Sequence, residues 1–256
     1  MTLQIECLPA FDDNYFWLLR DVGSGQTAVV DPGDAGVVLA ALDRFGARLD
    51  WILNTHHHAD HVGGNLELKA ATGCRIAGPG TDAARIPGID LPVLDGDAFA
   101  LGESVARVLF TPGHTRGHIA WWFAAEHALF CGDTLFSLGC GRLFEGDAPT
   151  MWASLSKLAA LPADTRVYCA HEYTLANARF ALTVDAGNPA LLERIVAVRA
   201  LRARGEPSIP TSMGAELACN PFLRAGQADL AAGLGMHGAP AVAVFAELRR
   251  RKDGFR

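Results

Sequence analysis

Short apolar runs bounded by Asp, Asn and Gly predict a series of strands along the chain. Leu3, Ile5 and Cys7 alternate with polar neighbours, which is the pattern of a half-buried strand. Continuous apolar runs are expected instead in strands that are buried on both faces. Runs of this kind lie at residues 15–19 and 28–30, and mainly apolar strands are also predicted at 51–53, 105–110, 128–131 and 166–170.

Helical periodicity alternates with these strands. Apolar residues recur at helical spacing over residues 34–45, and Gly46 is expected to end that helix. Further helical stretches are predicted at about 62–72 and at 150–160. Strands that alternate with helices are typical of an α/β layered fold.

The pattern becomes mainly helical after residue 172. Two apolar series at helical spacing predict two helices, one through Phe180 and one through Ile195. Pro207 and Pro210 mark a loop, and a last helix is expected from near Pro240 to Lys252. We therefore expect two domains, residues 1–172 and a helical domain over residues 173–256.

Composition and charge exclude several classes of protein. The chain of 256 residues is 50% hydrophobic and 20% charged, a globular composition. The net charge of −6 argues against broad binding of polyanions such as nucleic acid. No apolar run approaches the ~20 residues of a membrane span, and the N-terminus lacks the features of a secretory signal. The six cysteines form no C-x-x-C pair, so reduced thiols and a cytoplasmic location are expected.

The densest chemistry lies in the segment N-T-H-H-H-A-D-H-V-G-G-N at residues 54–65. It places four histidines and one aspartate in six positions, from His56 to His61. Imidazole and carboxylate groups at this density are typical of transition-metal sites. The alternative is a polar surface loop that happens to be rich in histidine. The apolar run 51–53 precedes the segment, so the ligands would follow the carboxyl end of a strand, where α/β sheets tend to carry their sites.

Three further strands each lead into a candidate ligand. The run 105–110 leads to His114 in T-P-G-H-T-R-G-H, the run 128–131 leads to Asp133, and the run 166–170 leads to His171. Four predicted strands thus deliver ligand residues at the same end. This repetition argues against the surface-loop alternative.

These motifs carry a resemblance to a known family. T-H-x-H-x-D-H followed by P-G-H-T, G-D and a strand-terminal His resembles the metallo-β-lactamase superfamily. Within it, the segments G-D-T-L-F-S-L-G-C-G-R, A-H-E-Y-T, N-P-F-L-R and R-R-R-K-D are similar to the glyoxalase II (hydroxyacylglutathione hydrolase) family. The resemblance implies a four-layer αββα metallo-β-lactamase fold with a C-terminal helical domain. Residues 1–172 would be the catalytic domain and residues 173–256 the glutathione-binding domain.

The resemblance also implies two divalent metal ions, with Zn²⁺ preferred and Fe or Mn as alternatives. The first ion would be held by His56, His58 and His114, the second by Asp60, His61 and His171, with Asp133 bridging the two. His57 and His118 are expected to lie outside the ligand set, His57 as a polar loop residue and His118 in packing or behind the ligands.

The implied activity is hydrolysis of S-(2-hydroxyacyl)glutathione, such as S-D-lactoylglutathione, to glutathione and D-lactate, the second step of methylglyoxal detoxification. Metal coordination can lower the pKa of water from ~15.7 to ~7, and the hypothesis is that Asp60 and Asp133 orient the attacking water. No protein nucleophile is then required.

The carboxylate of glutathione calls for fixed cations. The resemblance places Arg142, Phe144, Tyr173, Arg249 and Lys252 around the substrate. Phe144 lacks the hydroxyl of the Tyr found at this place in some family members. Spacing alone favours a different interpretation of residues 249–252, a solvated basic helix end.

Two alternatives stay open at this stage. An enzyme with the same fold and metals could cleave a lactone, a phosphodiester or a β-lactam, although a β-lactamase would usually be exported. A binding protein could use structural metals and grip nucleic acid with its basic tail, although structural zinc sites are usually rich in cysteine. The expected partner is a glutathione thioester, with neither nucleic acid nor membrane, and the expected state is a monomer.

Overall fold

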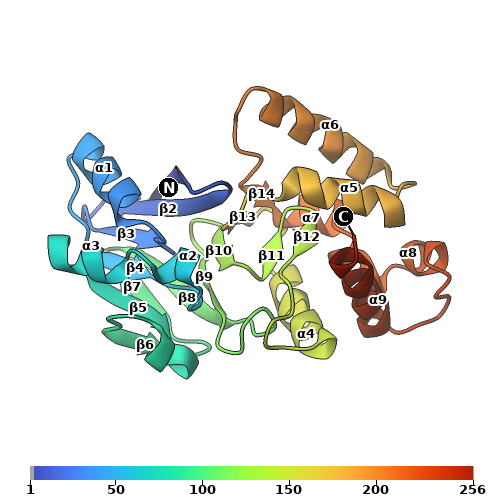
Figure 1. The fold of residues 1–256 in the computed structure, drawn as a ribbon, viewed down its shortest axis with the longest axis horizontal. Helices are drawn as coiled ribbons and strands as arrows, with labels where there is room; N and C mark the ends of the chain where they lie inside the picture. Colours follow the sequence, from blue (N-terminus) through green and yellow to red (C-terminus); the bar gives the residue numbers. More distant parts are fainter. Residues whose placement is uncertain (1–2, 256) are drawn as a thin grey trace. The chain divides into compact units, whose positions relative to one another are not determined.

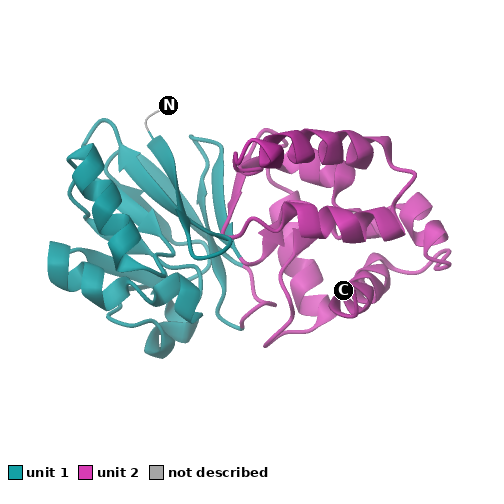
Figure 2. Ribbon diagram, turned by 45° about the horizontal axis from the view of Figure 1, so that its top comes forward, with its two compact units in different colours: residues 1–110, 116–132 teal, residues 111–115, 133–256 magenta. Residues whose placement is uncertain are grey.

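The computed structural model describes residues 3–255. Contacts within the chain divide it into two units, which Figure 2 shows in different colours. Unit 1 consists of residues 1–110 and 116–132, and unit 2 of residues 111–115 and 133–256.

A mixed sheet forms the first half of unit 1. Its strands follow one another in sequence order, and they are β1 (Leu3–Ala10), β2 (Asn14–Asp21), β3 (Thr27–Val30), β4 (Trp51–Leu53), β5 (Arg75–Pro79) and β6 (Leu91–Val93). The first three strands are antiparallel, and β3 to β6 are parallel. The strands predicted at 3–7, 15–19, 28–30 and 51–53 are confirmed. Strands β5 and β6 were not predicted.

Helices α1 (Ala35–Phe45) and α3 (Asn65–Thr72) cover one face of this sheet (Figure 1). Asp34 caps α1 by accepting the amide of Val37, and Gly46 ends it in the left-handed region with φ of 57°. Both helices pack their apolar faces onto the sheet in one buried cluster. The helix expected from 34 to 45 is therefore confirmed.

The helix expected at about 62–72 is divided in two. Helix α2 (Ala59–Val62) ends at Gly63, and α3 begins after Gly64. The amide of Gly64 donates to the carbonyl of Pro32 at 2.9 Å. A Cβ at Gly63 would lie 2.6 Å from the carbonyl oxygen of Gly33. Glycine is thus required here because two backbone segments touch.

Four antiparallel strands complete unit 1. They are β7 (Ala98–Leu101), β8 (Ser104–Phe110), β9 (Ile119–Phe123) and β10 (Ala128–Gly132), joined in that order. Strands β8 and β10 both pair with β9, so they run in the same direction and end at the same edge. His114 follows the end of β8, and Asp133 follows the end of β10. The ring of Phe99 contacts Trp51 on β4 edge-on at 5.1 Å, which joins the two sheets of unit 1. The 3₁₀ segment η1 (Gly80–Arg85) links β5 to β6.

Unit 2 contains short strands and most of the helices. The strands are β11 (Leu135–Phe136), β12 (Gly139–Cys140), β13 (Arg166–Cys169) and β14 (Thr211–Ser212). The helices are α4 (Ala148–Ala159), α5 (Thr174–Val184), α6 (Pro189–Ala203), α7 (Met213–Cys219), the 3₁₀ segment η2 (Leu223–Gly226), α8 (Ala228–Gly233) and α9 (Ala241–Asp253). Helices α4, α5, α6 and α9 were predicted and are confirmed. The short elements α7, η2 and α8 were not.

Two findings bear on the environment of the chain. Within residues 3–255, no helix combines the length and the apolar character that crossing a bilayer requires. All six cysteines lie in this described range, and each is a free thiol.

A buried carboxylate connects the two sheets of unit 1. Asp21 ends β2 and accepts hydrogen bonds from the Ser24 amide at 2.8 Å and the Ser24 hydroxyl at 2.7 Å. Its other oxygen accepts the hydroxyl of Ser104, at the start of β8, at 2.8 Å. Burial alone would raise the pKa of Asp21, but these hydrogen bonds outweigh it and lower the pKa from 3.8 to about 2.

This lowered pKa predicts a pH-dependent stability. The ionised Asp21 stabilises the fold fully above its unfolded pKa, ~3.9, and the contribution is lost as pH falls toward 2. We expect Asp21→Asn to lower the free energy of unfolding at neutral pH by about 2 kcal/mol. Urea unfolding at a series of pH values should show the gap between variant and parent closing between roughly pH 5 and pH 2.

Asp43→Asn is the matched control, because Asp43 is exposed on α1. That change should alter the free energy of unfolding by less than about 0.5 kcal/mol. A gap for Asp21→Asn that stays constant with pH would contradict the assignment.

Candidate metal and substrate site

The histidine segment begins directly after β4. His56 and His61 are buried, and the Nε2 atom of His56 lies 3.0 Å from the Nδ1 atom of His58. Two nitrogens that bind one zinc ion at ~2.0–2.1 Å in a tetrahedron stand roughly 3.3 Å apart. The spacing of these two ring nitrogens therefore suits a shared ion.

The ring of His61 lies against the carboxylate of Asp31. Its Oδ2 atom lies 3.1 Å from Nδ1 of His61, and the carboxylate also accepts the amide and the hydroxyl of Thr55 at 2.7 and 2.6 Å. An ionised carboxylate has no proton to donate, so this ion-pair contact favours the tautomer of His61 that carries its proton on Nδ1. The Nε2 atom then presents its lone pair on the side of Asp60, 3.4 Å from Oδ2. A carboxylate behind a ligand histidine is the usual arrangement in metal sites.

The sequence did not single out Asp31 as a functional residue. We interpreted residues 31–34 only as a turn that opens a helix. The available signal was its position, because Asp31 directly follows β3 as His114 and Asp133 closely follow their strands. Asp31, His56 and His61 bring their ligand atoms within 4.8 Å of one another, yet the bonds from Thr55 favour an orienting role for Asp31 over metal ligation.

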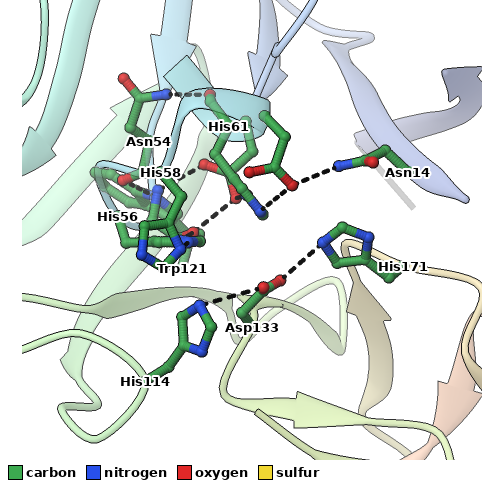
Figure 3. Close-up of polar contacts among 12 residues, drawn as sticks. Asn14, Asn54, His56, His58, His61, His114, Trp121, Asp133 and His171 are labelled. Carbon is green, nitrogen blue, oxygen red and sulfur yellow. Dashed lines mark hydrogen bonds and ion pairs between the residues drawn. The ribbon is translucent and has the colours of Figure 1, made fainter. Parts of the chain in front are cut away.

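Asn14 was missed as well. Its side-chain amide donates to Oδ2 of Asp60 at 3.1 Å, and Figure 3 shows Asn14 pointing toward the histidine segment. Asn14 is buried at the start of β2. An amide N–H can only donate, so Asp60 must present this oxygen as an acceptor.

His57 and His118, which we expect to lie outside the ligand set, make other contacts. The Nδ1 atom of His57 lies 3.5 Å from Oδ2 of Asp82, and its Nε2 atom contacts the guanidinium of Arg85. Both partners belong to η1, so both ring nitrogens of His57 contact that segment. His118 is buried and stacks on the ring of His56 with centroids 4.9 Å apart.

In unit 2, one carboxylate lies between two histidines. The Oδ2 atom of Asp133 is 3.3 Å from Nε2 of His114, and the Oδ1 atom is 3.4 Å from Nε2 of His171 (Figure 3). All three residues are buried. A carboxylate that directs each oxygen to a different histidine has the arrangement of a bridging ligand.

The backbone fixes the tautomer of His114. Its Nδ1 atom lies 2.9 Å from the carbonyl oxygen of Arg142, and a carbonyl can only accept. In the neutral ring, Nε2 therefore presents a lone pair toward the carboxylate of Asp133. Two electron-rich atoms in this arrangement suit a cation held between them, and histidine with carboxylate is a ligand set that Zn²⁺, Fe and Mn accept.

A pocket of about 420 Å³ adjoins these residues in unit 2. His114 and Asp133 form part of its wall. It is also lined by all five residues expected around the substrate, which are Arg142, Phe144, Tyr173, Arg249 and Lys252.

Aromatic contacts connect the pocket to the histidines. The ring of Tyr173 stacks on His171 with centroids 4.7 Å apart and planes within 3°. Phe144 is 61% exposed and meets the ring of His114 edge-on at 5.2 Å. Because Phe144 has no hydroxyl, it offers the pocket an apolar surface at this point.

The interpretation of residues 249–252 as a solvated helix end is wrong for Arg249 and Lys252. Arg249 is only 4% exposed, donates to the carbonyl of Cys140 at 3.1 Å and pairs with Asp253 at 2.7 Å. Lys252 is half-buried. Helical spacing correctly places the two on one face, but it does not show that the protein covers that face. Arg250 lies between them in sequence and is exposed.

The cations make this pocket electrostatically positive. Burial lowers the pKa of Lys252, and the charges of Arg249, Arg179 and Arg142 lower it further. Cations that disfavour one another's charge are relieved when an anion binds among them. The pocket is therefore suited to an anionic ligand.

Comparisons with known proteins show which family the chain belongs to. The family model described as "Metallo-beta-lactamase superfamily" matches residues 10–171, and that described as "Hydroxyacylglutathione hydrolase C-terminus" matches residues 172–255. A hydroxyacylglutathione hydrolase of Methylococcus capsulatus (strain Bath) is 60% identical over 254 residues, covering 99% of each chain. One of Rhodospirillum rubrum is 56% identical with the same coverage.

A solved structure is similar as well. TTHA1623, crystallised in a di-iron-bound form, is 27% identical with a TM-score of 0.60, over 86% of this chain and all of that one. The expected metallo-β-lactamase fold with a C-terminal helical domain is thus confirmed. The family matches together span residues 10–255, and the relatives match along their whole length. The chain therefore belongs to the hydroxyacylglutathione hydrolase (glyoxalase II) family of the metallo-β-lactamase superfamily.

Proposed function

We propose that the protein hydrolyses S-D-lactoylglutathione and related 2-hydroxyacyl thioesters of glutathione to glutathione and the free hydroxy acid. The observation that carries this proposal is the pocket of unit 2. It combines two candidate metal ligands, His114 and Asp133, with the cations Arg142, Arg249 and Lys252. A thioester whose leaving group carries carboxylates needs both parts.

Two divalent metal ions would be held by the seven residues that the sequence singles out. His56, His58 and His114 would bind the first, Asp60, His61 and His171 the second, and Asp133 both. We favour Zn²⁺, with Fe or Mn as alternatives, and the similar protein TTHA1623 was crystallised with two irons. When bound, such ions polarise a carbonyl and lower the pKa of water from ~15.7 toward ~7.

Neighbouring groups of the protein would orient the candidate ligands for this chemistry. The carbonyl of Arg142 and the carboxylate of Asp31 hold the protonated nitrogens of His114 and His61. Asn14 holds one oxygen of Asp60. Asp60 and Asp133 would then accept hydrogen bonds from the attacking water and direct it at the thioester carbon.

The substrate would be held by its glutathione part. Arg142, Arg249 and Lys252 would bind the glycine carboxylate, Tyr173 would donate its hydroxyl, and Phe144 would supply an apolar contact. A thiol with a pKa near ~8.5 leaves readily as a thiolate. Strong assistance from a general acid is therefore unnecessary.

We further propose that the protein acts as a monomer in the cytoplasm, in the second step of methylglyoxal degradation, without nucleic acid or membrane as partner. Its six free thiols support a reducing compartment.

The metal assignment predicts that ligand loss removes metal and turnover together. We expect His58→Ala and Asp133→Ala to lower kcat by at least about 10³-fold, because the ions supply the larger part of the barrier reduction. Metal content per chain should fall in the same variants, measured by elemental analysis beside the thioester assay. His237→Ala is the control, since His237 lies outside every motif. Full turnover in a metal-depleted variant would end this account.

The cation cluster predicts a defect confined to substrate binding. Lys252→Met keeps the apolar stem but removes the charge, so we expect KM for S-D-lactoylglutathione to rise about tenfold. Metal content and kcat should stay close to the parent values. Arg250→Met changes an exposed cation on the same helix and should leave KM unaltered. An unchanged KM in Lys252→Met would remove this residue from the site.

The proposal also predicts a substrate preference. In side-by-side assays, kcat/KM for S-D-lactoylglutathione should exceed that for a simple lactone or a β-lactam by at least about 10³-fold, since a simple lactone has no carboxylate for the cations and a β-lactam lacks the glutathione part that the pocket would hold. A faster reaction with the lactone or the β-lactam would assign the protein to another hydrolase activity.

A further inference from the structure

The turn between β11 and β12 has a conformation that it cannot maintain by itself. Its residue Leu138 has φ of 59°, in the left-handed region that disfavours a branched side chain. The two strands pair through only two residue pairs, Leu135 with Cys140 and Phe136 with Gly139. So short a ladder supplies little stability. Other parts of unit 2 must therefore hold the turn.

Glu216 on α7 holds the turn from one side. Its carboxylate is completely buried and accepts the amide of Leu138 at 2.8 Å and the hydroxyl of Ser137 at 3.1 Å. It also accepts the hydroxyl of Thr211 at 2.8 Å and the side-chain amide of Asn220 at 3.0 Å. A buried carboxylate is costly unless its oxygens are satisfied in this way. These hydrogen bonds therefore fix the position of the turn relative to α7.

Two asparagines hold the carbonyls of the same turn. The side-chain amide of Asn220 donates to the carbonyls of Phe136 and Gly139 at 3.1 and 3.0 Å. That of Asn177 on α5 donates to the carbonyl of Ser137 at 3.0 Å. Donors from the helical part of the chain thus bind each of these three carbonyls.

The ends of this hairpin carry residues of the site. Asp133 lies two positions before β11, and Arg142 lies two positions after β12. The amide of Gly141 donates to the carbonyl of Thr134 at 3.2 Å, which ties the two ends together. The carbonyl of Arg142 in turn fixes His114. A displaced turn would therefore displace a bridging carboxylate, the tautomer of a ligand and a substrate cation at once.

We infer that Glu216 is a positioning residue for the hydrolysis: through the β11–β12 turn it sets the places of Asp133 and Arg142. This inference rests on the proposed function, because it concerns the same pocket. Glu216 does not line that pocket, so its effect is transmitted through the turn rather than by contact with the substrate.

The hydrogen-bond pattern distinguishes two replacements. In Glu216→Gln the amide oxygen can accept from Leu138 and Asn220, while the new N–H groups donate to the hydroxyls of Ser137 and Thr211, which can accept as well. Glu216→Leu has a similar size but leaves the turn without these bonds.

The experiment measures zinc affinity by competition with a chelator, together with kcat and KM. We expect Glu216→Leu to weaken zinc binding and to lower kcat by roughly 10–100-fold each, as for other residues that orient metal ligands. Glu216→Gln should stay within about threefold of the parent, which would be rescue by the conservative variant. Asn220→Ala should shift both quantities in the same direction by a smaller factor, and it serves if Glu216→Leu does not fold.

Asp185→Leu is the matched control. Asp185 is a buried carboxylate of unit 2 that binds Arg224 and Asn188. Its loss should lower the melting temperature while zinc affinity and kcat of the folded protein stay unchanged. Parent-like zinc affinity and kcat in Glu216→Leu would overturn the inference, and so would equal losses in Glu216→Gln and Glu216→Leu. If the parent protein did not cleave the thioester, the proposed function would fail, but zinc affinity would still test the role of Glu216.

Discussion

The site depends on a simple property of the neutral imidazole ring, which has one nitrogen that donates and one that accepts. A histidine binds a metal only if the fold places the proton on the nitrogen facing away from it. The carbonyl of Arg142 does this for His114, and the ion-pair contact with the carboxylate of Asp31 favours it for His61. Neither partner can donate, so both contacts favour a ring whose lone pair faces the other candidate ligands. The strands and turns of the two units serve largely to place such acceptors.

The helices that follow residue 172 also help to position residues of the site, because they bind the β11–β12 hairpin. Asp133 and the carbonyl of Arg142 flank a hairpin that has little stability of its own. Glu216, Asn220 and Asn177 hold that hairpin by its amide, hydroxyl and carbonyl groups. Arg249 on α9 adds a bond to the carbonyl of Cys140. A tail that only covered the substrate would not need to bind the backbone of this loop. The two family matches meet at residues 171 and 172, whereas the contacts of the chain place residues 133–256 in one unit.

Local signals explain what the sequence could predict. Strands β4, β8, β10 and β13 are mainly apolar, and each leads into a candidate ligand, so both the strand and the candidate residue could be found. Strand β6 has three residues and contains Pro92, and β5 contains Gly78 and Pro79. Neither strand therefore shows the hydrophobic pattern that predicts a strand. Asp31 and Asn14 were missed because their roles arise from contact with distant residues. Arg249 was misjudged because helical spacing shows which residues share a face and leaves open what covers that face.

The electrostatics of the pocket follow from the chain as a whole. The protein has a net charge of −6, yet Arg142, Arg249 and Lys252 meet at one pocket. The positive potential of this acidic protein is therefore local to the pocket. It attracts small anions there, and the rest of the surface does not attract polyanions. Burial and the neighbouring arginines both disfavour the charge on Lys252, so the close approach of these cations carries an electrostatic cost. A small ligand with carboxylates relieves that cost, whereas a neutral lactone leaves it in place. The cations that disfavour one another's charge thus favour an anionic ligand over a neutral one.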